Sequence, residues 1–116
     1  MINLIQEKAY KFALRIVRLA AYLNNEKREF VLSKKILDSG VNVSLFVEEA
    51  QQGENRQDFI HKYAVANKEA VKTELLLRLL RDTEHISISQ SESLIADCSE
   101  LHALLVSSLK TAKGNL

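Results

Sequence analysis

The sequence predicts an all-α protein, an up-down-up-down antiparallel four-helix bundle. Proline is absent from its 116 residues, only three residues are glycine, and 47% are hydrophobic. This composition favours long helices over sheets and tight turns. Polar breaks separate four segments in which apolar residues recur every three or four positions, as they do along one side of a helix. Short connections between such segments make sequence neighbours antiparallel.

The chain length fits one domain, residues 1–116, with helices expected at 3–24, 28–52, 56–82 and 89–112. The third segment is expected at the centre of the bundle, because its apolar positions alternate by four and three. These positions are Phe59, Tyr63, Ala66, Ala70, Thr73, Leu77 and Leu80. Asn55 is expected to cap its start.

The second segment fits two interpretations. Residues 41–47 alternate like a strand, but no second alternating segment is present for a strand to pair with, so one helix is expected. Gly40 inside that helix is tolerable if a neighbouring helix approaches closely, and Gly53 is expected to end it. The fourth helix is expected to start with a capping pair of Ser89 and Glu92, and residues 113–116 to form a frayed tail.

Charge and cysteine content limit the functional classes. Sixteen basic and fifteen acidic residues leave a net charge of +1, so composition does not require a nucleic acid or membrane partner. No apolar stretch reaches the roughly 20 residues that a membrane crossing needs. The single Cys98 cannot form an internal disulfide, and the N-terminus does not look like a secretion signal. A cytoplasmic location is expected.

One basic stripe is the candidate nucleic-acid-binding site. It consists of Lys8, Lys11, Arg15 and Arg18, which are spaced by three, four and three along the first helix. The competing interpretation is an ordinary solvated helix face beside Glu7. Phe12, Phe59 and Tyr63 all lie on core stripes, so stacking on exposed bases is not expected.

Apolar residues outside the core stripes form the candidate oligomer interface. They are Val41, Leu45, Phe46, Leu75, Leu76 and Leu79. A monomer would leave part of this surface in water, which favours association of several copies.

No catalytic residue, metal ligand, cofactor or small-molecule substrate is expected. Bundles that hold two metal ions use Glu-x-x-His motifs, and the sequence has none. Asp58 and His61 are spaced so that both could hold a metal ion from one helix face. Asp58 is better explained as an acidic residue at the start of a helix, and His61 as a solvent-exposed side chain. Cys98 lies on the apolar stripe of the fourth helix, beside acidic residues that do not activate a thiol.

Several short segments follow one another in a distinctive order and spacing. They are Phe30–Lys34, Leu37–Gly40, Val47–Ala50, Asp58–Ile60, Ala64–Ala70, Thr73–Glu74 and Leu77–Leu80. Together they resemble the four-helix-bundle family named for the intervening sequences inserted in some bacterial 23S rRNA genes. The resemblance covers nearly the whole chain.

The resemblance implies a bacterial protein without enzymatic activity that forms ring-shaped homo-oligomers, commonly pentamers. A related group serves as the accessory protein of diversity-generating retroelements, so structured RNA or a nucleic acid-binding protein is the implied partner. The alternative is a protein–protein interaction module without nucleic acid contact. The salt dependence of RNA binding separates the two, because counterion release weakens nucleic acid binding as salt rises.

Overall fold

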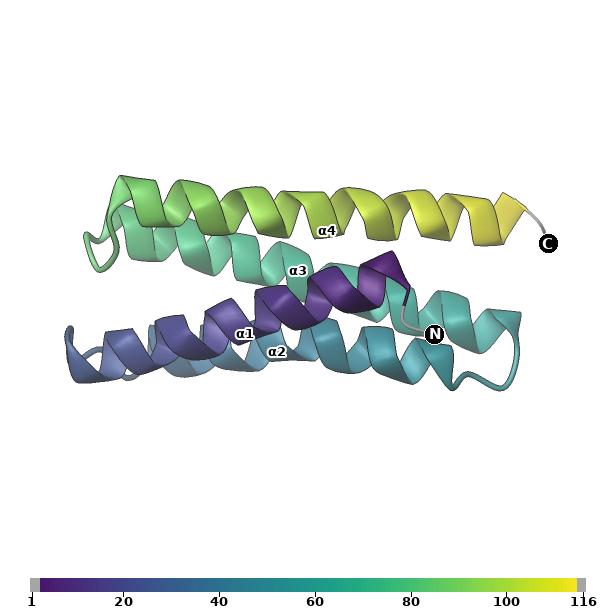
Figure 1. Cartoon of the computed structure of the whole chain (residues 1–116), viewed down its shortest axis with the longest axis horizontal. Coiled ribbons are helices and arrows are strands. Elements are labelled where there is room, and N and C mark those ends of the chain that lie inside the picture. The colour runs from purple at the N-terminus through teal and green to yellow at the C-terminus, as the bar shows by residue number, and fades with distance from the viewer. Residues whose placement is uncertain (1–2, 115–116) are drawn as a thin grey trace.

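In a computed structural model of the chain, which describes residues 3–114, four α-helices follow one another. They are α1 (Leu4–Asn25), α2 (Leu32–Gln51), α3 (Arg56–Asp82) and α4 (Ile88–Gly114). The helices lie side by side in alternating directions and form a bundle 47 Å long and 22 by 20 Å across (Figure 1). The predicted all-α four-helix bundle is confirmed. Residues 41–47, for which a strand was the alternative, lie inside α2.

Side-chain caps fix the starts of α1 and α3. The Asn3 side chain accepts a hydrogen bond from the Gln6 backbone N–H, and the Gln6 side chain accepts one from the Asn3 N–H. At α3, the Asn55 side chain accepts from the Asp58 N–H at 2.9 Å, as the sequence predicted. Each cap satisfies backbone donors that the first helical turn leaves free.

Helix α2 begins four residues later than predicted, at Leu32. The Glu29 carboxylate accepts from the backbone N–H groups of Val31, Leu32 and Ser33 at 3.2, 3.0 and 2.8 Å, and so takes the place of an N-cap side chain. Burial would raise the pKa of Glu29, but these three hydrogen bonds lower it overall. Arg28 has a φ of 51°, which interrupts any helix at that position.

Helix α4 begins at Ile88 because Ser87 and Gln90, rather than the predicted Ser89 and Glu92, form the reciprocal cap. Each side chain accepts from the other residue's N–H at 3.0 Å. The helix continues to Gly114. Residues 115 and 116 of the predicted tail lie outside the described residues.

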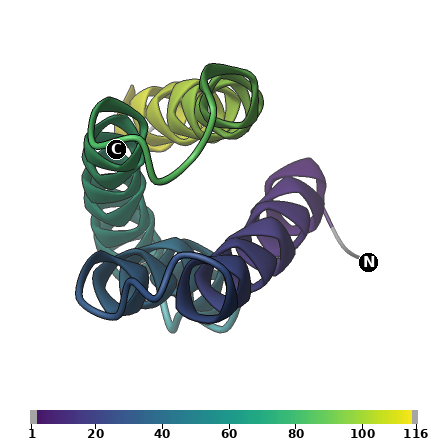
Figure 2. The same ribbon diagram turned by 90° about the vertical axis from the view of Figure 1, so that its left-hand side faces the viewer.

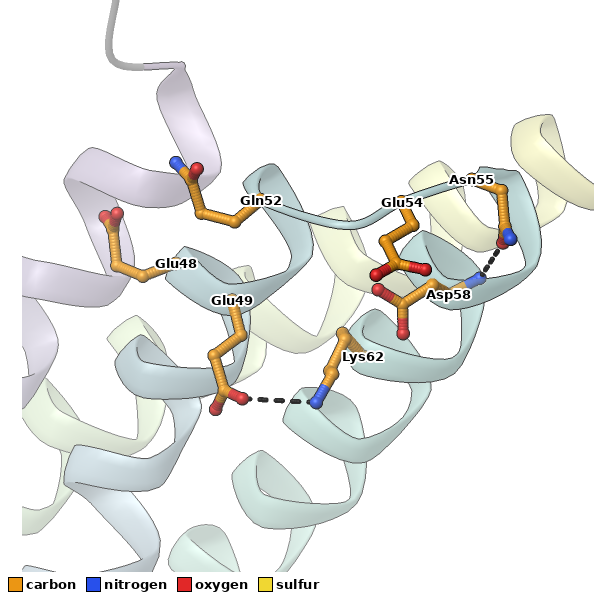
Figure 3. Close-up of a pocket in the computed structure, with 7 residues that line it drawn as sticks. All are labelled: Glu48, Glu49, Gln52, Glu54, Asn55, Asp58 and Lys62. Atoms are coloured by element: carbon orange, nitrogen blue, oxygen red, sulfur yellow. Dashed lines mark hydrogen bonds and ion pairs between the residues drawn. The ribbon is translucent and has the colours of Figure 1, made fainter.

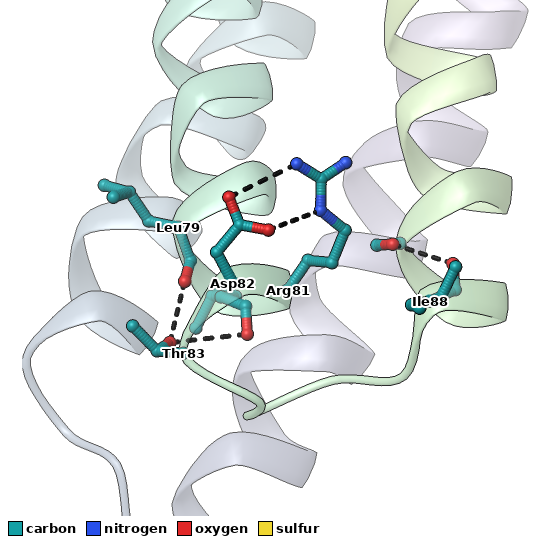
Figure 4. A network of polar contacts seen from close by, with 7 residues as sticks. Leu79, Arg81, Asp82, Thr83 and Ile88 are labelled. Carbon is teal, nitrogen blue, oxygen red and sulfur yellow. Dashed lines mark hydrogen bonds and ion pairs between the residues drawn. The ribbon is translucent and has the colours of Figure 1, made fainter.

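The turn between α3 and α4 is held by side chains at the end of α3 (Figure 4). The Thr83 hydroxyl donates to the Leu79 carbonyl at 2.7 Å, and the Arg81 guanidinium pairs with Asp82. The Leu79 carbonyl also accepts from the Thr83 N–H at 3.0 Å, so the hydroxyl adds a second hydrogen bond at the end of the helix.

The predicted central seam of α3 is buried, except at Phe59. Tyr63, Ala66, Ala70, Thr73, Leu77 and Leu80 are all at most 1% exposed. Phe59 is only partly buried, and its ring packs 4.3 Å from that of Tyr63. The seam packs into one cluster with buried side chains of the other three helices, among them Phe12, Val43 and Leu101.

Two contacts set the heights of α1, α2 and α3 relative to one another. Gly40 of α2 lies directly against Ile16 of α1, since a Cβ at Gly40 would stand 2.7 Å from the Ile16 Cγ2. The close helix approach that makes a glycine tolerable at this position is therefore present. Next to it, the buried Ser39 hydroxyl lies 2.8 Å from the Thr73 hydroxyl of α3. Ile16, Ser39, Gly40 and Thr73 thus lie at one level along the bundle.

Helices α1 and α4 close the bundle less tightly than the other neighbouring pairs. The view along the bundle shows α2 and α3 joined closely to each other, with α1 and α4 at the two ends of the arrangement (Figure 2). The α1–α4 edge is therefore where polar side chains can lie between helices.

Candidate interaction surfaces

The predicted basic stripe on α1 lies along the α1–α4 edge, where carboxylates meet most of it. Lys8 pairs with Glu100 of α4. Arg15 pairs with Asp97 and also donates to the Ser93 hydroxyl at 2.9 Å. Hydrogen bonding to Glu100 and its charge raise the pKa of Lys8.

The two remaining cations of the stripe differ. Lys11 pairs with Glu7 of the same helix at 3.0 Å, and this hydrogen bond and charge lower the pKa of Glu7. Arg18 is exposed. Three of the four predicted cations therefore already have a carboxylate partner within the chain. Nucleic acid binding by this stripe stays a prediction, and phosphates would have to compete with these partners.

The predicted interface residues divide into two groups. Leu45, Leu75 and Leu79 are 52%, 50% and 42% exposed, and Val41, one turn before Leu45 on α2, is half-buried. Phe46 and Leu76 instead pack against the core from its edge. The structure therefore leaves the first group available on the outside and places much of the second inside the bundle.

Three exposed apolar residues on α1 were missed by the sequence analysis. Tyr10, Leu14 and Val17 are 63%, 37% and 45% exposed. They are spaced by four and three, so they form a second apolar stripe on the same helix as the core stripe. This spacing was the available signal, and it was overlooked because the core stripe of α1 is longer.

The α1 stripe and the exposed residues of α2 lie next to each other. Tyr10 and Val17 share a helical row with Gln6 and Asn24, whose side chains bond to Glu48 and Ser33 of α2. This row therefore follows the α2 side of α1. On α2, Val41 and Leu45 share a row with Glu48, which meets α1 through the same Gln6 bond. We call these five apolar residues, Tyr10, Leu14, Val17, Val41 and Leu45, the hairpin surface.

A second apolar surface lies on the outside of α3. It consists of Val71, Leu75 and Leu79, which are spaced by four and are between 42% and 54% exposed. On one side of it, Lys62 reaches Glu49 of α2. On the other side, Glu74 accepts from Ser99 of α4. We call these three residues the α3 surface.

Three lysines without a carboxylate partner lie near the turn between α1 and α2. Lys27, Lys34 and Lys35 are exposed and belong to none of the ion pairs of the described chain. The Arg28 guanidinium stands 5.2 Å from the centre of the Phe30 ring, which is 54% exposed. The sequence analysis did not single out this turn, because its positive charge comes from a loop and a helix start rather than from one stripe.

An acidic hollow lies beside the turn between α2 and α3 (Figure 3). It is lined by Glu48, Glu49, Gln52, Glu54, Asn55, Asp58 and Lys62. Lys62 pairs with Glu49 at 3.1 Å, and the Asn55 side chain is occupied by the α3 cap. Within residues 3–114, no group of three or more metal-ligating side chains is placed to hold an ion.

Cys98 is buried and its thiol donates to the Ala70 carbonyl at 3.2 Å. Burial, together with the charge of Glu74, raises its pKa to about 12. The thiol is therefore protonated near neutral pH and is a packing group rather than a nucleophile. Across the described helices, none is both long and apolar enough to cross a membrane.

Comparison with a solved structure agrees with this fold. The chain is similar to a crystal structure of a protein of unknown function from the S23 ribosomal protein family of Bacteroides thetaiotaomicron, with 45% sequence identity and a TM-score of 0.92. The similarity covers 92% of this chain and 99% of that one. A search of curated proteins finds no match.

Comparison with family models confirms the resemblance found in the sequence. The model of the 23S rRNA-intervening sequence protein family matches residues 3–107. The match spans α1, α2 and α3 in full and most of α4. The chain therefore belongs to the 23S rRNA-intervening sequence protein family.

Proposed function

We propose that the protein is a non-enzymatic, homo-oligomeric scaffold whose copies associate through exposed apolar side chains. The carrying observation is that the hairpin surface and the α3 surface expose seven large apolar residues, with the half-buried Val41 beside them, in two patches. Contiguous exposed apolar surface favours association, at about 25 cal/mol for each Å² removed from water. The family resemblance gives a ring, commonly of five copies, as the expected form.

The chemistry of the described residues supports a binding function over a catalytic one. A catalytic site brings several titratable groups together in a pocket and shifts their pKa values. Here the shifted groups are surface ion pairs, the helix cap at Glu29 and the protonated Cys98 thiol. The acidic hollow is open to solvent and contains its own Lys62–Glu49 ion pair.

The test compares two substitutions on the same helix. Leu14→Glu places a charge on the hairpin surface, whereas Lys11→Glu changes the basic stripe and is the matched control. We expect analytical ultracentrifugation to show that Leu14→Glu lowers the oligomer mass and that Lys11→Glu leaves it unchanged. If the wild type and both variants have the same mass, and both variants keep their helical content, the proposal is contradicted.

RNA binding is the second candidate function, and the unpaired cations at the α1–α2 turn favour it. Lys27, Lys34 and Lys35 can meet phosphates without first leaving a carboxylate, and Phe30 offers an exposed aromatic ring. Repetition of this turn in an oligomer would place several such patches on one particle. The competing candidate is a protein partner with no nucleic acid contact.

A titration with labelled structured RNA separates these candidates. RNA binding predicts an affinity that falls steeply between low and physiological salt, because bound phosphates release counterions. The double variant Lys34→Glu, Lys35→Glu should abolish it, while Lys8→Glu should change it little because Lys8 is already paired with Glu100. Absence of binding at low salt would favour the protein-only alternative.

A further inference from the structure

The α1–α4 edge is the side of the bundle on which no turn joins the two neighbouring helices, because α1 is the first helix of residues 3–114 and α4 the last (Figure 2). Each of the other three neighbouring pairs contains a contact between buried residues. These contacts are Ile16 with Gly40, Ser39 with Thr73, and Ala70 with Cys98. Separation of α1 from α4 therefore strains no connecting turn and breaks none of these contacts.

The polar contacts across this edge are few and exposed. Lys8 pairs with Glu100, while Arg15 pairs with Asp97 and bonds to Ser93. Along the described chain, no other hydrogen bond or ion pair joins α1 to α4. The four charged side chains are between 37% and 54% exposed, so water and salt weaken both ion pairs.

A cleft of about 100 Å³ lies next to these ion pairs. It is lined by Lys8, Lys11, Phe12, Asp97 and Glu100. Phe12 is a core residue that is only 1% exposed, so charged side chains adjoin the core at this edge. Atoms that line a gap lose part of their dispersion contacts, which agrees with the sparse contact between α1 and α4.

Local opening of a protein begins where contacts are fewest and polar bonds are most exposed. We infer that the α1–α4 edge separates without global unfolding, while α1 stays on α2, α4 stays on α3, and the extensive α2–α3 contact acts as the hinge. Screening of the two ion pairs favours the open form, so the opening responds to salt. This inference goes beyond the proposed self-association, because the hairpin surface and the α3 surface contain no residue of either ion pair.

The single cysteine of the chain reports the opening. Cys98 is buried on the core side of α4, and its raised pKa of about 12 keeps the thiol unreactive while the edge is closed. Labelling by N-ethylmaleimide, an uncharged reagent, is followed by mass spectrometry and scaled to the rate for the unfolded chain. We expect the labelling rate to depend less on urea than global unfolding does, because opening of one edge exposes less surface.

Removal of the two ion pairs should speed the labelling. In the double variant Lys8→Gln, Arg15→Gln, we expect labelling of Cys98 in about 0.1 M NaCl to be about 2- to 30-fold faster, as loss of two exposed ion pairs allows. Raising NaCl to about 1 M should speed labelling of the wild type and change the double variant little, because the screened pairs are already absent there. Lys11→Gln is the matched control and should leave the rate unchanged, because its partner Glu7 lies on the same helix.

A second thiol position tests whether the opening is confined to the edge. Ser39→Cys, combined with Cys98→Ser, places the one thiol in the α2–α3 contact, where Ser39 is 4% exposed. This thiol should react more slowly than Cys98 and with the full urea dependence of global unfolding. The inference is overturned if Cys98 shows that same urea dependence, if its rate is unchanged in the folded double variant, or if both thiols react equally fast. Circular dichroism checks folding, and Lys8→Gln alone, with a smaller expected rise, repeats the test if the double variant is unfolded.

Discussion

Helix α1 carries a basic stripe and an apolar stripe outside the core, and the rest of the chain supplies partners mainly to the basic one. Lys8, Lys11 and Arg15 are matched by carboxylates of α4 or of α1 itself. Tyr10 and Val17, on the other side, remain close to or more than half exposed.

The difference shows which side chains the bundle leaves available. Lys8, Lys11 and Arg15 find partners inside the chain, and exposed ion pairs contribute little to stability once formed. Apolar surface that stays in water keeps an unfavourable hydration free energy, which is relieved when another molecule covers that surface. Apolar association rather than electrostatic attraction is therefore the driving force in the proposed self-association.

The largest expected effect on stability comes from comparing a buried leucine with an exposed leucine on α3. Leu77 is fully buried, so Leu77→Ala should lower the free energy of unfolding by about 2–5 kcal/mol. Leu75 is half exposed, and Leu75→Ala should change the free energy of unfolding by less than about 0.5 kcal/mol when measured in the Leu14→Glu background, in which the proposed subunit contacts are expected to be lost. Urea unfolding at one protein concentration measures both. Equal losses would mean that the core and the outer surface have been confused.

A smaller effect is expected from a buried polar pair. The Thr73 hydroxyl lies 2.8 Å from both the Ser39 hydroxyl and the Glu69 carbonyl. Thr73→Val keeps the shape but removes both bonds, and should cost about 1–2 kcal/mol of unfolding free energy. In the Thr73→Val background, Ser39→Ala should lower the unfolding free energy by less than it does in the wild type, because the Ser39 hydroxyl has already lost its Thr73 partner there. Strict additivity in urea unfolding would argue against the pair.

The helix cap at Glu29 should show a pH-dependent effect of about 1 kcal/mol, as expected for loss of a cap. Because the pKa of Glu29 is lowered from its ordinary 4.5, its stabilising contribution is present above that value and is lost as pH falls through the lowered pKa. Glu29→Gln should therefore destabilise the protein at pH 7, and the difference from the wild type should shrink in acid. A difference that is the same at pH 7 and in acid would show that the carboxylate charge is not involved.

The smallest effect should come from the α1–α4 edge. Asp97→Asn removes the charge that faces Arg15, an ion pair whose two side chains are 37% and 48% exposed. The expected loss is below about 1 kcal/mol and should disappear in high salt. Thermal unfolding at low and high salt measures it. A loss comparable to that of Leu77→Ala would show that the edge is held by charge after all.

The fold was predictable because the information it needs is local. Heptad spacing identified the α3 seam apart from Phe59, which is only partly buried, and the Asn55 cap was expected. The start of α2 was missed because a glutamate that caps from outside the helix has no fixed sequence pattern. At α4, two overlapping Ser-x-x-Gln/Glu pairs fitted the same rule, and Ser87 with Gln90 is the pair that forms.

The interaction surfaces were less predictable because they depend on distant parts of the chain. The partners of Lys8 and Arg15 lie more than 80 residues further along, so a pattern on one helix could not reveal that these charges are matched. Likewise, Phe46 and Leu76 lie off the core stripes of their own helices but pack against the core edge. Only the packing of the helices decides which side of each remains outside.

The mass of the wild-type protein in solution tests self-association most directly. Size-exclusion chromatography coupled to light scattering, over a dilution series that includes micromolar protein, should give one species whose mass is a whole-number multiple of 13.1 kDa. Because apolar contacts strengthen rather than weaken in concentrated sulfate, that mass should persist there. A single species of 13.1 kDa at micromolar concentration would contradict the proposed homo-oligomeric scaffold.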